Sequence, residues 1–338
     1  GSYRKSVVCL ALSHRIRLYS DRMGTTSFAV SPFSLKLGGV GSRSPRSTFR
    51  MSVDGGAKKV ALPDLAGKRV LVTGASGGLG QRMAIEFAKQ KCKILVHYFT
   101  RREGAGHTVQ ECEEAGSPFT MSFRADLRSE AAIQTLVDCV EKNFGGVDVL
   151  VNNAGIVVKS AVEDCDSKCF DDIYAVNIRA PYLLSRQLAA GMKQYGSGVV
   201  INISSIHGQD SAVEFMSAYA MSKAALNALT QSMAAEWAPT IRVLAIAPGV
   251  VPVERTQKAL EEMKDMWLEC LPMKRYGTGD EIAKMAIFLA SESSAWTTGS
   301  VVTVDGGMTA RMFAPIRAKP ASPPEPSPVE HPSTPAGP

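Results

Sequence analysis

The sequence predicts a doubly wound α/β domain with a parallel sheet, flanked by two unstructured tails. Three observations lead to this fold class. Short runs rich in Val and Ile alternate with longer amphipathic segments along residues 58–312. The short runs are apolar on both faces, as in parallel strands that helices cover on each side. A glycine-rich turn, residues 73–80, joins the first short run to the first amphipathic segment.

The predicted strands are short, rich in β-branched residues and bounded by turn residues. They are residues 69–73, 93–98, 119–124, 147–152, 199–204, 241–247 and 301–304. Longer segments with apolar residues at helical spacing separate them, among them 171–195 and 218–238. Ligands of such sheets bind at the carboxyl edge, near the change in strand order. Functional residues are therefore expected at the ends of the predicted strands.

The first strand–helix junction reads TGASGGLG. Glycine lets the backbone approach a pyrophosphate, which then sits at the helix N-terminus, where free N–H groups and the helix dipole favour anions. A glycine-rich turn that only closes a tight connection is the alternative. The residues expected to bind a dinucleotide cofactor here are Thr73, Gly74, Ser76, Gly78, Leu79 and Gly80.

The end of the second strand carries no acid. Enzymes that prefer NAD usually place an acidic residue there to bind the ribose 2′-hydroxyl. This chain reads HYFTRR over residues 97–102. Arg101 and Arg102 can form charge-assisted hydrogen bonds to a 2′-phosphate, so the sequence favours NADP(H). Solvated loop arginines are the alternative.

A possible reaction centre follows the fifth predicted strand. A carbonyl that accepts a hydride needs a proton donor, and a tyrosine with an ordinary pKa of about 10 is a weak one near neutral pH. Lys223 lies one helical turn after Tyr219, so its ammonium is expected to lower that pKa. Ser205 is expected to hydrogen-bond the substrate oxygen, with Ser204 as a neighbour.

These motifs, in this order, make residues 58–312 resemble the short-chain dehydrogenase/reductase family. The family's last strand is similar to GSVVTVDGG at residues 299–307. The resemblance implies a Rossmann fold and an NAD(P)-dependent oxidoreductase that interconverts an alcohol and a carbonyl. The segments that carry it are the turn at 73–80, Asn152-Asn153-Ala154-Gly155, Asn177, Ser205, Tyr219-x-x-x-Lys223 and Pro248-Gly249.

The resemblance also assigns catalytic roles. It implies that Tyr219 donates the proton, that Lys223 tunes the tyrosine and binds the cofactor ribose, and that Ser205 orients the oxygen. Ser205 is preferred over Ser204 because it stands three residues before Gly208, as in the family pattern Ser-x-x-Gly. Asn177 corresponds to a residue that holds a water linking the lysine to solvent.

Further cofactor contacts follow from the resemblance. Asp126 matches the position that contacts the adenine, and Asn153 and Gly155 match residues on the ribose side. Pro248 and Gly249 complete the expected cofactor set. A cap of the helix that begins near residue 129 is an equally good local role for Asp126.

The chain departs from the family at three places. Gly77 stands where many NADP-preferring relatives carry a basic residue, so the two arginines after the second strand must supply the phosphate preference. Val253 replaces a threonine that often hydrogen-bonds the cofactor, and Thr256 is the residue that would compensate. Residues 250–274 are Met-rich and mixed in charge, which indicates a mobile lid; an amphipathic helix packed on the sheet edge is the alternative.

The net charge of +6 is concentrated at the N-terminus. Residues 1–53 hold nine Lys/Arg and one acid, which leaves a near-neutral remainder, so nucleic-acid binding is not expected. Residues 1–57 are Ser- and Arg-rich and acid-poor, like an organelle transit peptide, with a plastid favoured over a mitochondrion. A basic tail or a tag remnant is the alternative and would leave the protein cytoplasmic.

The remaining composition sets further limits. Residues 313–338 hold nine prolines and are predicted to be an extended, solvated tail. No apolar run reaches the roughly 20 residues that a membrane span needs. The histidines and cysteines lack metal-ligand spacing, so no metal site is expected.

We therefore expect reversible hydride transfer between NADP(H) and a carbonyl. The overall resemblance and the organelle address favour a 3-oxoacyl-[acyl-carrier-protein] reductase of fatty-acid synthesis. A sugar, polyol or general carbonyl dehydrogenase of the same family is one alternative. A non-catalytic, cofactor-binding scaffold is the alternative of another class. The resemblance also implies a homo-oligomer, either dimer or tetramer, that pairs residues 171–195 and 218–238.

Overall fold

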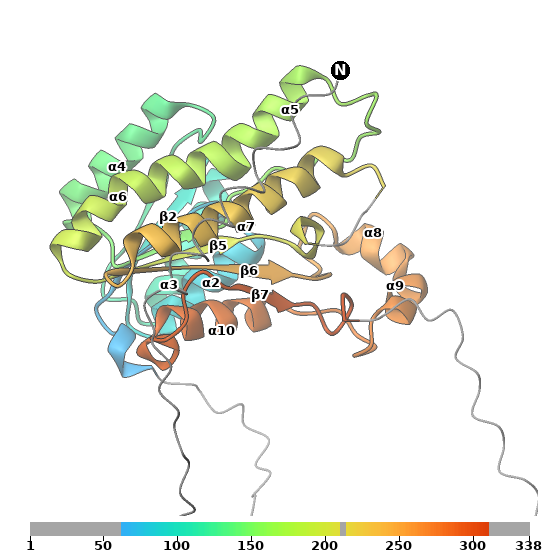
Figure 1. Ribbon diagram of the computed structural model, residues 1–338. Helices are drawn as coiled ribbons and strands as arrows, with labels where there is room; N and C mark the ends of the chain where they lie inside the picture. The colour runs from blue at the N-terminus through green and yellow to red at the C-terminus, as the bar shows by residue number, and fades with distance from the viewer. Residues whose placement is uncertain (1–61, 210–213, 311–338) are drawn as a thin grey trace, which may run out of the picture. The chain divides into compact units, whose positions relative to one another are not determined.

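The structure is a computed structural model, which describes residues 62–209 and 214–310 (Figure 1). The predicted tails, residues 1–57 and 313–338, lie outside the described residues. The described chain forms a seven-stranded parallel sheet in the order β3-β2-β1-β4-β5-β6-β7. Helices cover both faces of this sheet (Figure 1), which confirms the predicted doubly wound, Rossmann-type fold.

All the predicted strands are present, with ends that differ from the prediction by at most two residues. In the register of the sheet, Leu71 pairs with Leu95 on one side and with Leu150 on the other. The strands are β1 Arg69–Val72, β2 Lys93–Tyr98, β3 Thr120–Arg124, β4 Val149–Asn152, β5 Gly198–Ile203, β6 Ile241–Pro248 and β7 Val301–Val304.

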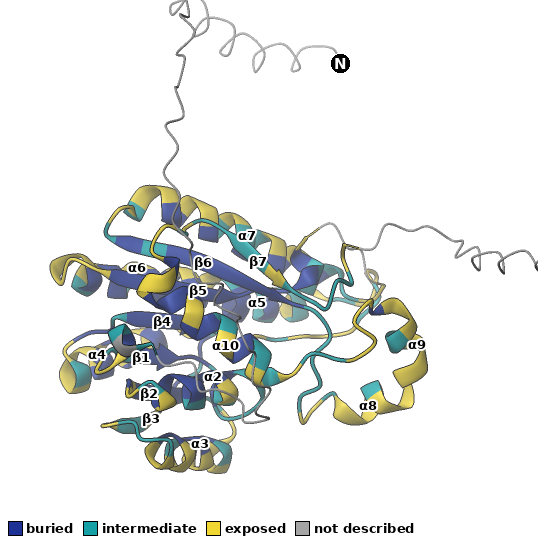
Figure 2. Cartoon of the chain, turned by 90° about the horizontal axis from the view of Figure 1, so that it is seen from below, coloured by how far each residue is buried: buried dark blue, intermediate teal, exposed yellow. Residues whose placement is uncertain are grey.

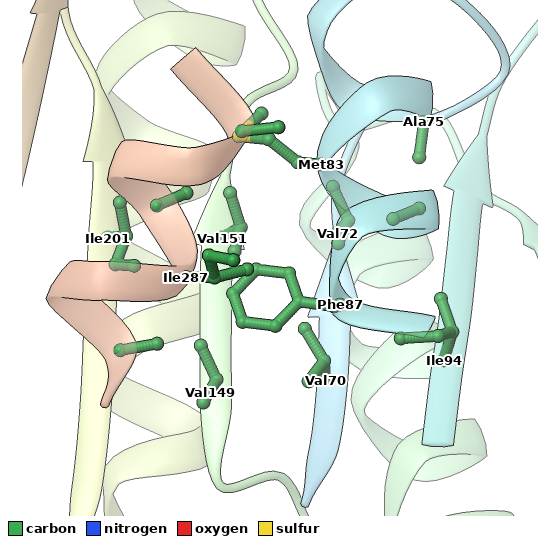
Figure 3. Packing of buried hydrophobic residues seen from close by; sticks show 14 of the residues in the cluster. Val70, Val72, Ala75, Met83, Phe87, Ile94, Val149, Val151, Ile201 and Ile287 are labelled. Atoms are coloured by element: carbon green, nitrogen blue, oxygen red, sulfur yellow. The ribbon is translucent and has the colours of Figure 1, made fainter. Parts of the chain in front are cut away.

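One face of the sheet packs against α2 Gly78–Lys89, α3 Arg102–Glu114 and α10 Gly279–Ala290. Figure 3 shows Phe87 of α2 lying among Val70 of β1, Val149 of β4 and Ile287 of α10. The Phe87 side chain is fully buried, and such burial contributes roughly 1.5–3 kcal/mol. Helix α10 follows β6 late in the chain, whereas β1 and α2 come early. Their packing brings early and late segments of the chain into one core.

The opposite face packs against α4 Glu130–Phe144, α6 Ala180–Gln194 and α7 Ser217–Trp237, which lie together above the sheet in Figure 1. Successive strand residues point to opposite faces, so Leu71 and Leu150 enter this second core while their neighbours Val70 and Val149 enter the first. Both faces are apolar because both are covered.

The segment 171–195 was predicted as one helix and is instead interrupted. α5 Ser167–Tyr174 is followed by a π-helical turn, η2 Ala175–Arg179, before α6 begins. Short 3₁₀ turns occur at η1 Pro63–Leu65, η3 Ile206–Gly208 and η4 Glu292–Ser294. π turns are rare and often lie at functional sites.

The predicted lid forms two short helices, α8 Gln257–Glu262 and α9 Lys264–Cys270. No residue of either helix is buried, and both appear exposed at one end of the sheet in Figure 2. An amphipathic helix packed on the sheet edge therefore does not describe this segment. Across the described ranges, no helix is long and apolar enough to span a membrane.

The strand order changes direction at β1, which pairs with β2 on one side and with β4 on the other. Loops that leave the carboxyl ends of these strands diverge to opposite faces and open a crevice between them. The functional residues predicted from the sequence lie at or after the carboxyl ends of β1, β2 and β4 and of their neighbours β3, β5 and β6.

Candidate active site

A cavity of about 660 Å³ lies at the carboxyl edge of the sheet. Its walls come from the turn after β1, the loops after the neighbouring strands, helix α7 and the start of the lid. Most of the predicted site residues line it: Gly74, Ser76, Gly78, Leu79, Arg101, Asp126, Asn153, Gly155, Ser205, Tyr219, Lys223, Pro248 and Gly249. The other predicted residues are not among the lining residues: Thr73, Gly80, Arg102 and Asn177.

Thr73 and Asn153 fasten the ends of β1 and β4 to each other. The Thr73 hydroxyl accepts hydrogen bonds from the N–H groups of Asn153 (2.9 Å) and Ala154 (3.0 Å). The Asn153 side-chain amide donates to the carbonyls of Thr73 (2.8 Å) and Gly74 (3.2 Å). Thr73 is buried, so it positions the turn rather than contacting a ligand.

The glycine-rich turn depends on its glycines for conformation and for space. Gly74 and Gly78 have φ of +64° and +59°, which favour glycine. A Cβ on Gly80 would stand 2.6 Å from the carbonyl oxygen of Gly74, so only glycine lets α2 approach the turn. The N-cap residue Gly77 offers no side-chain acceptor to the first-turn amides. This donor set fits the pyrophosphate of a dinucleotide.

Arg101 reaches the glycine-rich turn from the loop after β2. Its Nη1 lies 2.8 Å from the point where a Cβ of residue 77 would stand, so Gly77 leaves the space that the guanidinium fills. Arg101 Nη2 also donates to Glu254 Oε2 at 2.6 Å. Arg102 is the exposed first residue of α3 and lies away from the cavity lining. Of the two predicted arginines, Arg101 has the position to meet a 2′-phosphate.

His97 was not singled out from the sequence, yet it braces the same turn. Its Nδ1 accepts the N–H of Gly74 at 3.1 Å, and its Nε2 faces the carbonyl of Ala125 at the same distance. These partners assign the proton to Nε2. Burial lowers the pKa of His97 to about 4, so the ring is neutral. His97 could have been identified from the sequence as a polar residue inside an otherwise apolar strand.

The end of the cavity where the adenine was predicted to bind contains Asp126, Arg128 and Phe99. Arg128 forms an ion pair with Asp126 at 2.7 Å, and this hydrogen-bonded guanidinium lowers the pKa of the carboxyl. Arg128 also lies over the Phe99 ring, 5.6 Å from its centroid. Ser129 caps α4 by accepting from Ala132, so the alternative role of Asp126 as helix cap is wrong. Arg128 and Phe99 were not predicted from the sequence.

Helix α7 places Tyr219 and Lys223 on one face. Lys223 Nζ donates to the carbonyl of Ile203, the last residue of β5, at 2.7 Å. The same nitrogen is 5.7 Å from the centre of the Tyr219 ring. Lys223 is 4% exposed, and burial lowers its pKa to about 8. The lysine is thus anchored beside the tyrosine and remains largely charged at neutral pH.

Opposing effects act on the pKa of Tyr219. Burial raises its pKa, while a hydrogen bond with Ser205 and the positive charge of Arg255 act in the opposite direction. Lys223, which was predicted to lower this pKa, directs its ammonium to the Ile203 carbonyl. Tyr219 is therefore protonated at neutral pH, as a proton donor to a carbonyl must be.

The two serines after β5 have different environments. Ser205 interacts with Tyr219 and accepts the backbone N–H of His207 at 3.2 Å. The Ser204 hydroxyl is buried against α7, where it donates to the carbonyl of Lys223 at 3.4 Å. Ser205 is thus the serine that can share a substrate oxygen with Tyr219.

Asn177 lies in the π turn and ties it to the loop after β4. Its Oδ1 accepts the N–H of Ile156 at 2.8 Å, and its Nδ2 donates to the carbonyl of Ile156 and to Ser222 Oγ. A Cβ at Gly155 would stand 3.5 Å from Asn177 Oδ1 and 3.6 Å from Lys223 Nζ. The amide and the ammonium therefore converge at Gly155, where a water could join them.

The start of the lid faces the glycine-rich turn. Val253 Cγ1 lies 3.6 Å from the Cβ position of Gly78. The Thr256 hydroxyl accepts the backbone N–H of Val253 at 3.1 Å, so it supports the lid backbone while lining the cavity. Glu254 and Arg255 also line the cavity, and neither was predicted from the sequence.

These groups support proton transfer coupled to hydride transfer. A nicotinamide cofactor, when bound, supplies or accepts the hydride. The first turn of α2, Arg101 and Lys223 would hold it. Ser205 and Tyr219 would hold the substrate oxygen, and Tyr219 would give its proton to that oxygen. In residues 62–209 and 214–310, no group of three or more His, Cys, Asp or Glu could hold a metal ion.

The chain is similar to proteins of known families. The family model described as "Enoyl-(Acyl carrier protein) reductase" matches residues 74–309. The 3-oxoacyl-[acyl-carrier-protein] reductase FabG of Staphylococcus epidermidis is 32% identical over 71% of this chain and 98% of its own length. A 2-dehydro-3-deoxy-D-gluconate 5-dehydrogenase of Dickeya dadantii is 34% identical over 73% of this chain and 98% of its own length.

A solved structure shares the fold. The short-chain type dehydrogenase/reductase from Mycobacterium marinum has a TM-score of 0.69 and 31% identity, covering 74% of this chain and 98% of that one. The family match extends from the glycine-rich turn through the Tyr219–Lys223 helix and beyond β7. The chain belongs to the short-chain dehydrogenase/reductase family and is an oxidoreductase that uses a nicotinamide cofactor on an alcohol or carbonyl.

Proposed function

We propose that the protein is an NADPH-dependent reductase that converts a carbonyl to a secondary alcohol. The observation that carries the cofactor choice is the guanidinium of Arg101, which fills the space beside Gly77 at the glycine-rich turn. The loop after β2 offers no carboxylate for a ribose 2′-hydroxyl. A planar guanidinium at this place suits a 2′-phosphate.

The first candidate substrate is a 3-oxoacyl thioester on an acyl carrier protein. The description of the matching family and the FabG relative support this class. In the proposed reaction, Ser205 and Tyr219 orient the 3-oxo group, Tyr219 protonates its oxygen, and Lys223 stabilises the charge left on the tyrosine. Asn177 and Lys223 then return a proton through the region beside Gly155.

A carbonyl compound with a carboxylate is the second candidate. Arg255 lines the cavity, and its positive charge acts on the Tyr219 hydroxyl, so it stands where it can meet an anionic substrate group. The relative that acts on 2-dehydro-3-deoxy-D-gluconate takes a sugar acid. This candidate corresponds to the sugar dehydrogenase alternative with a sugar acid as the substrate.

The test is NADPH oxidation by the full chain, followed by absorbance. The substrates are acetoacetyl-carrier protein, an acetoacetyl thioester without the carrier, a panel of keto acids of sugars, and neutral sugars and ketones. Preference for the carrier-bound thioester supports the first candidate, and turnover confined to keto acids supports the second. NADPH binding without turnover of any carbonyl, in the wild type as in Tyr219→Phe, would instead favour a non-catalytic scaffold.

We also propose that the protein works as a homo-oligomer through α6 and α7. Met221, Ala224 and Ala228 form an exposed stripe on α7, and Tyr182 is exposed on α6. Small residues allow close helix packing across such a face. Sedimentation of the wild type and of Ala224→Arg tests this assignment, since a bulky charge on the stripe should reduce the assembly to a smaller species.

For residues 1–57 we propose an address to an organelle matrix, with the plastid stroma as the first candidate. The Arg- and Ser-rich, acid-poor composition supports this proposal. The test is the location of a fluorescent protein that carries residues 1–57 at its N-terminus. A diffuse cytoplasmic signal would contradict it.

A further inference from the structure

The lid and the loop after β2 meet across the cofactor cavity. Glu254, at the start of the lid, receives a hydrogen bond from Arg101 Nη2 at 2.6 Å. The preceding lid residue, Val253, lies over Gly78 of the glycine-rich turn. Arg101 and Glu254 both line the cavity. The ion pair is therefore part of the site that we assign to the cofactor.

The two ends of the Arg101 guanidinium have different surroundings. Nη1 points to the glycine-rich turn, 2.8 Å from the Cβ position of Gly77, whereas Nη2 is engaged by the Glu254 carboxylate. The side chains are 51% and 70% exposed, so water screens their attraction and the pair can exchange partners. Glu254 is the acid paired with Arg101 among the described residues.

We propose that Glu254 weakens the preference for NADP(H) by competing with the 2′-phosphate of this cofactor for Arg101. This inference rests on the proposed NADPH dependence. A phosphate monoester carries more negative charge than a carboxylate and three acceptor oxygens, so it displaces Glu254 from the guanidinium. NADH brings only a hydroxyl to this place and has no charge to exchange for the carboxylate. Glu254 thus reduces the advantage that Arg101 gives to the phosphorylated cofactor.

The experiment measures binding by the full chain, without turnover. NADPH and NADH are titrated by nicotinamide fluorescence, and 2′,5′-ADP by calorimetry, against the wild type, Glu254→Gln and Arg101→Met. Glu262→Gln is the matched control, because Glu262 is an exposed carboxylate of the same lid that does not line the cavity. Glu262→Gln removes the same charge at a position outside the cavity lining, where the carboxylate does not contact Arg101.

We expect Glu254→Gln to tighten NADPH and 2′,5′-ADP by about twofold to fivefold, in line with the loss of a solvated ion pair that opposes binding. NADH affinity should stay within about twofold, and Glu262→Gln should behave as the wild type. Arg101→Met should weaken NADPH by about tenfold or more while sparing NADH, since a charge-assisted hydrogen bond is lost.

The outcomes separate this inference from the proposed function. Equal tightening of NADPH and NADH in Glu254→Gln, or an equal effect in Glu262→Gln, would overturn competition at Arg101. If Arg101→Met abolishes a preference for NADPH but Glu254→Gln binds as the wild type does, only the role of Glu254 fails. If the wild type binds NADH more tightly and Arg101→Met changes neither cofactor, the NADPH assignment fails as well.

Discussion

His97 is the residue through which acid should destabilise this protein most directly. The side chain is 2% exposed, and burial lowers its pKa from 6.5 to about 4. As the pH falls below about 6.5, the unfolded chain binds a proton at this residue, whereas the folded protein resists it until about pH 4. The contribution of neutral His97 is therefore complete above pH 6.5 and is lost as the pH falls toward 4.

The magnitude follows from the two pKa values. Their separation corresponds to about 3 kcal/mol over the full range and to about 2 kcal/mol between pH 7 and pH 5. Urea unfolding at these two pH values should show that the wild type loses about 2 kcal/mol more than His97→Asn, because all other groups titrate in both proteins. The variant starts less stable at pH 7, since it loses the hydrogen bond to Ala125.

The exposed His107 provides the control, because His107→Asn removes a histidine from the surface of α3. This variant should lose as much stability between pH 7 and pH 5 as the wild type does. The same loss in His97→Asn would refute the assignment of a buried, neutral ring to His97.

Three further outcomes are expected. Tyr219→Phe should lower kcat by about 10²-fold or more while cofactor affinity, measured by fluorescence, is retained; near-normal turnover would contradict its role as proton donor. Because burial lowers the pKa of Lys223 to about 8, kcat/KM should fall as the pH rises above 8, and Lys223→Arg should lack this limb of the profile. Arg69→Met should cost about 2–3 kcal/mol in urea unfolding without changing cofactor affinity, because the half-buried Asp148, at the opposite edge of the sheet, loses its guanidinium partner and keeps the backbone N–H of residue 69; weaker cofactor binding at full stability would contradict this.

The fold could be predicted because local pattern and burial agree along most of the chain. The residues of β1 and β4 are apolar at every position between their ends, as expected for strands of a sheet that helices cover on both faces. Periodicity does not distinguish an α-helix from a wider turn, so the π turn around Asn177 was not predicted. The turn becomes intelligible only when Asn177 is seen to bond with Ile156 of a separate loop.

The shared position of Tyr219 and Lys223 in the candidate site could be predicted because their spacing is local. Tyr219 and Lys223 are one helical turn apart, and their shared face is fixed by the helix. The direction of the Lys223 ammonium was not predictable, because its acceptor is the carbonyl of Ile203 on a strand. The positive charge of Arg255, which acts to lower the pKa of Tyr219 from a distant segment, was not predicted either.

Gly77 illustrates why a motif read one position at a time can mislead about cofactor choice. The absence of a basic side chain at residue 77 would argue against NADP(H) if that residue acted alone. In the fold, a glycine there creates the space that Arg101 fills from a different strand–helix loop. Binding of NADP(H) needs a positive charge at the 2′-phosphate, and either a basic residue at position 77 or Arg101 can supply it.

A side chain added at residue 77 would displace the Arg101 guanidinium, so Gly77→Ala should weaken NADPH binding even though no charge is removed. Unchanged NADPH affinity in that variant, measured by fluorescence titration, would mean that Arg101 can bind the phosphate from another position.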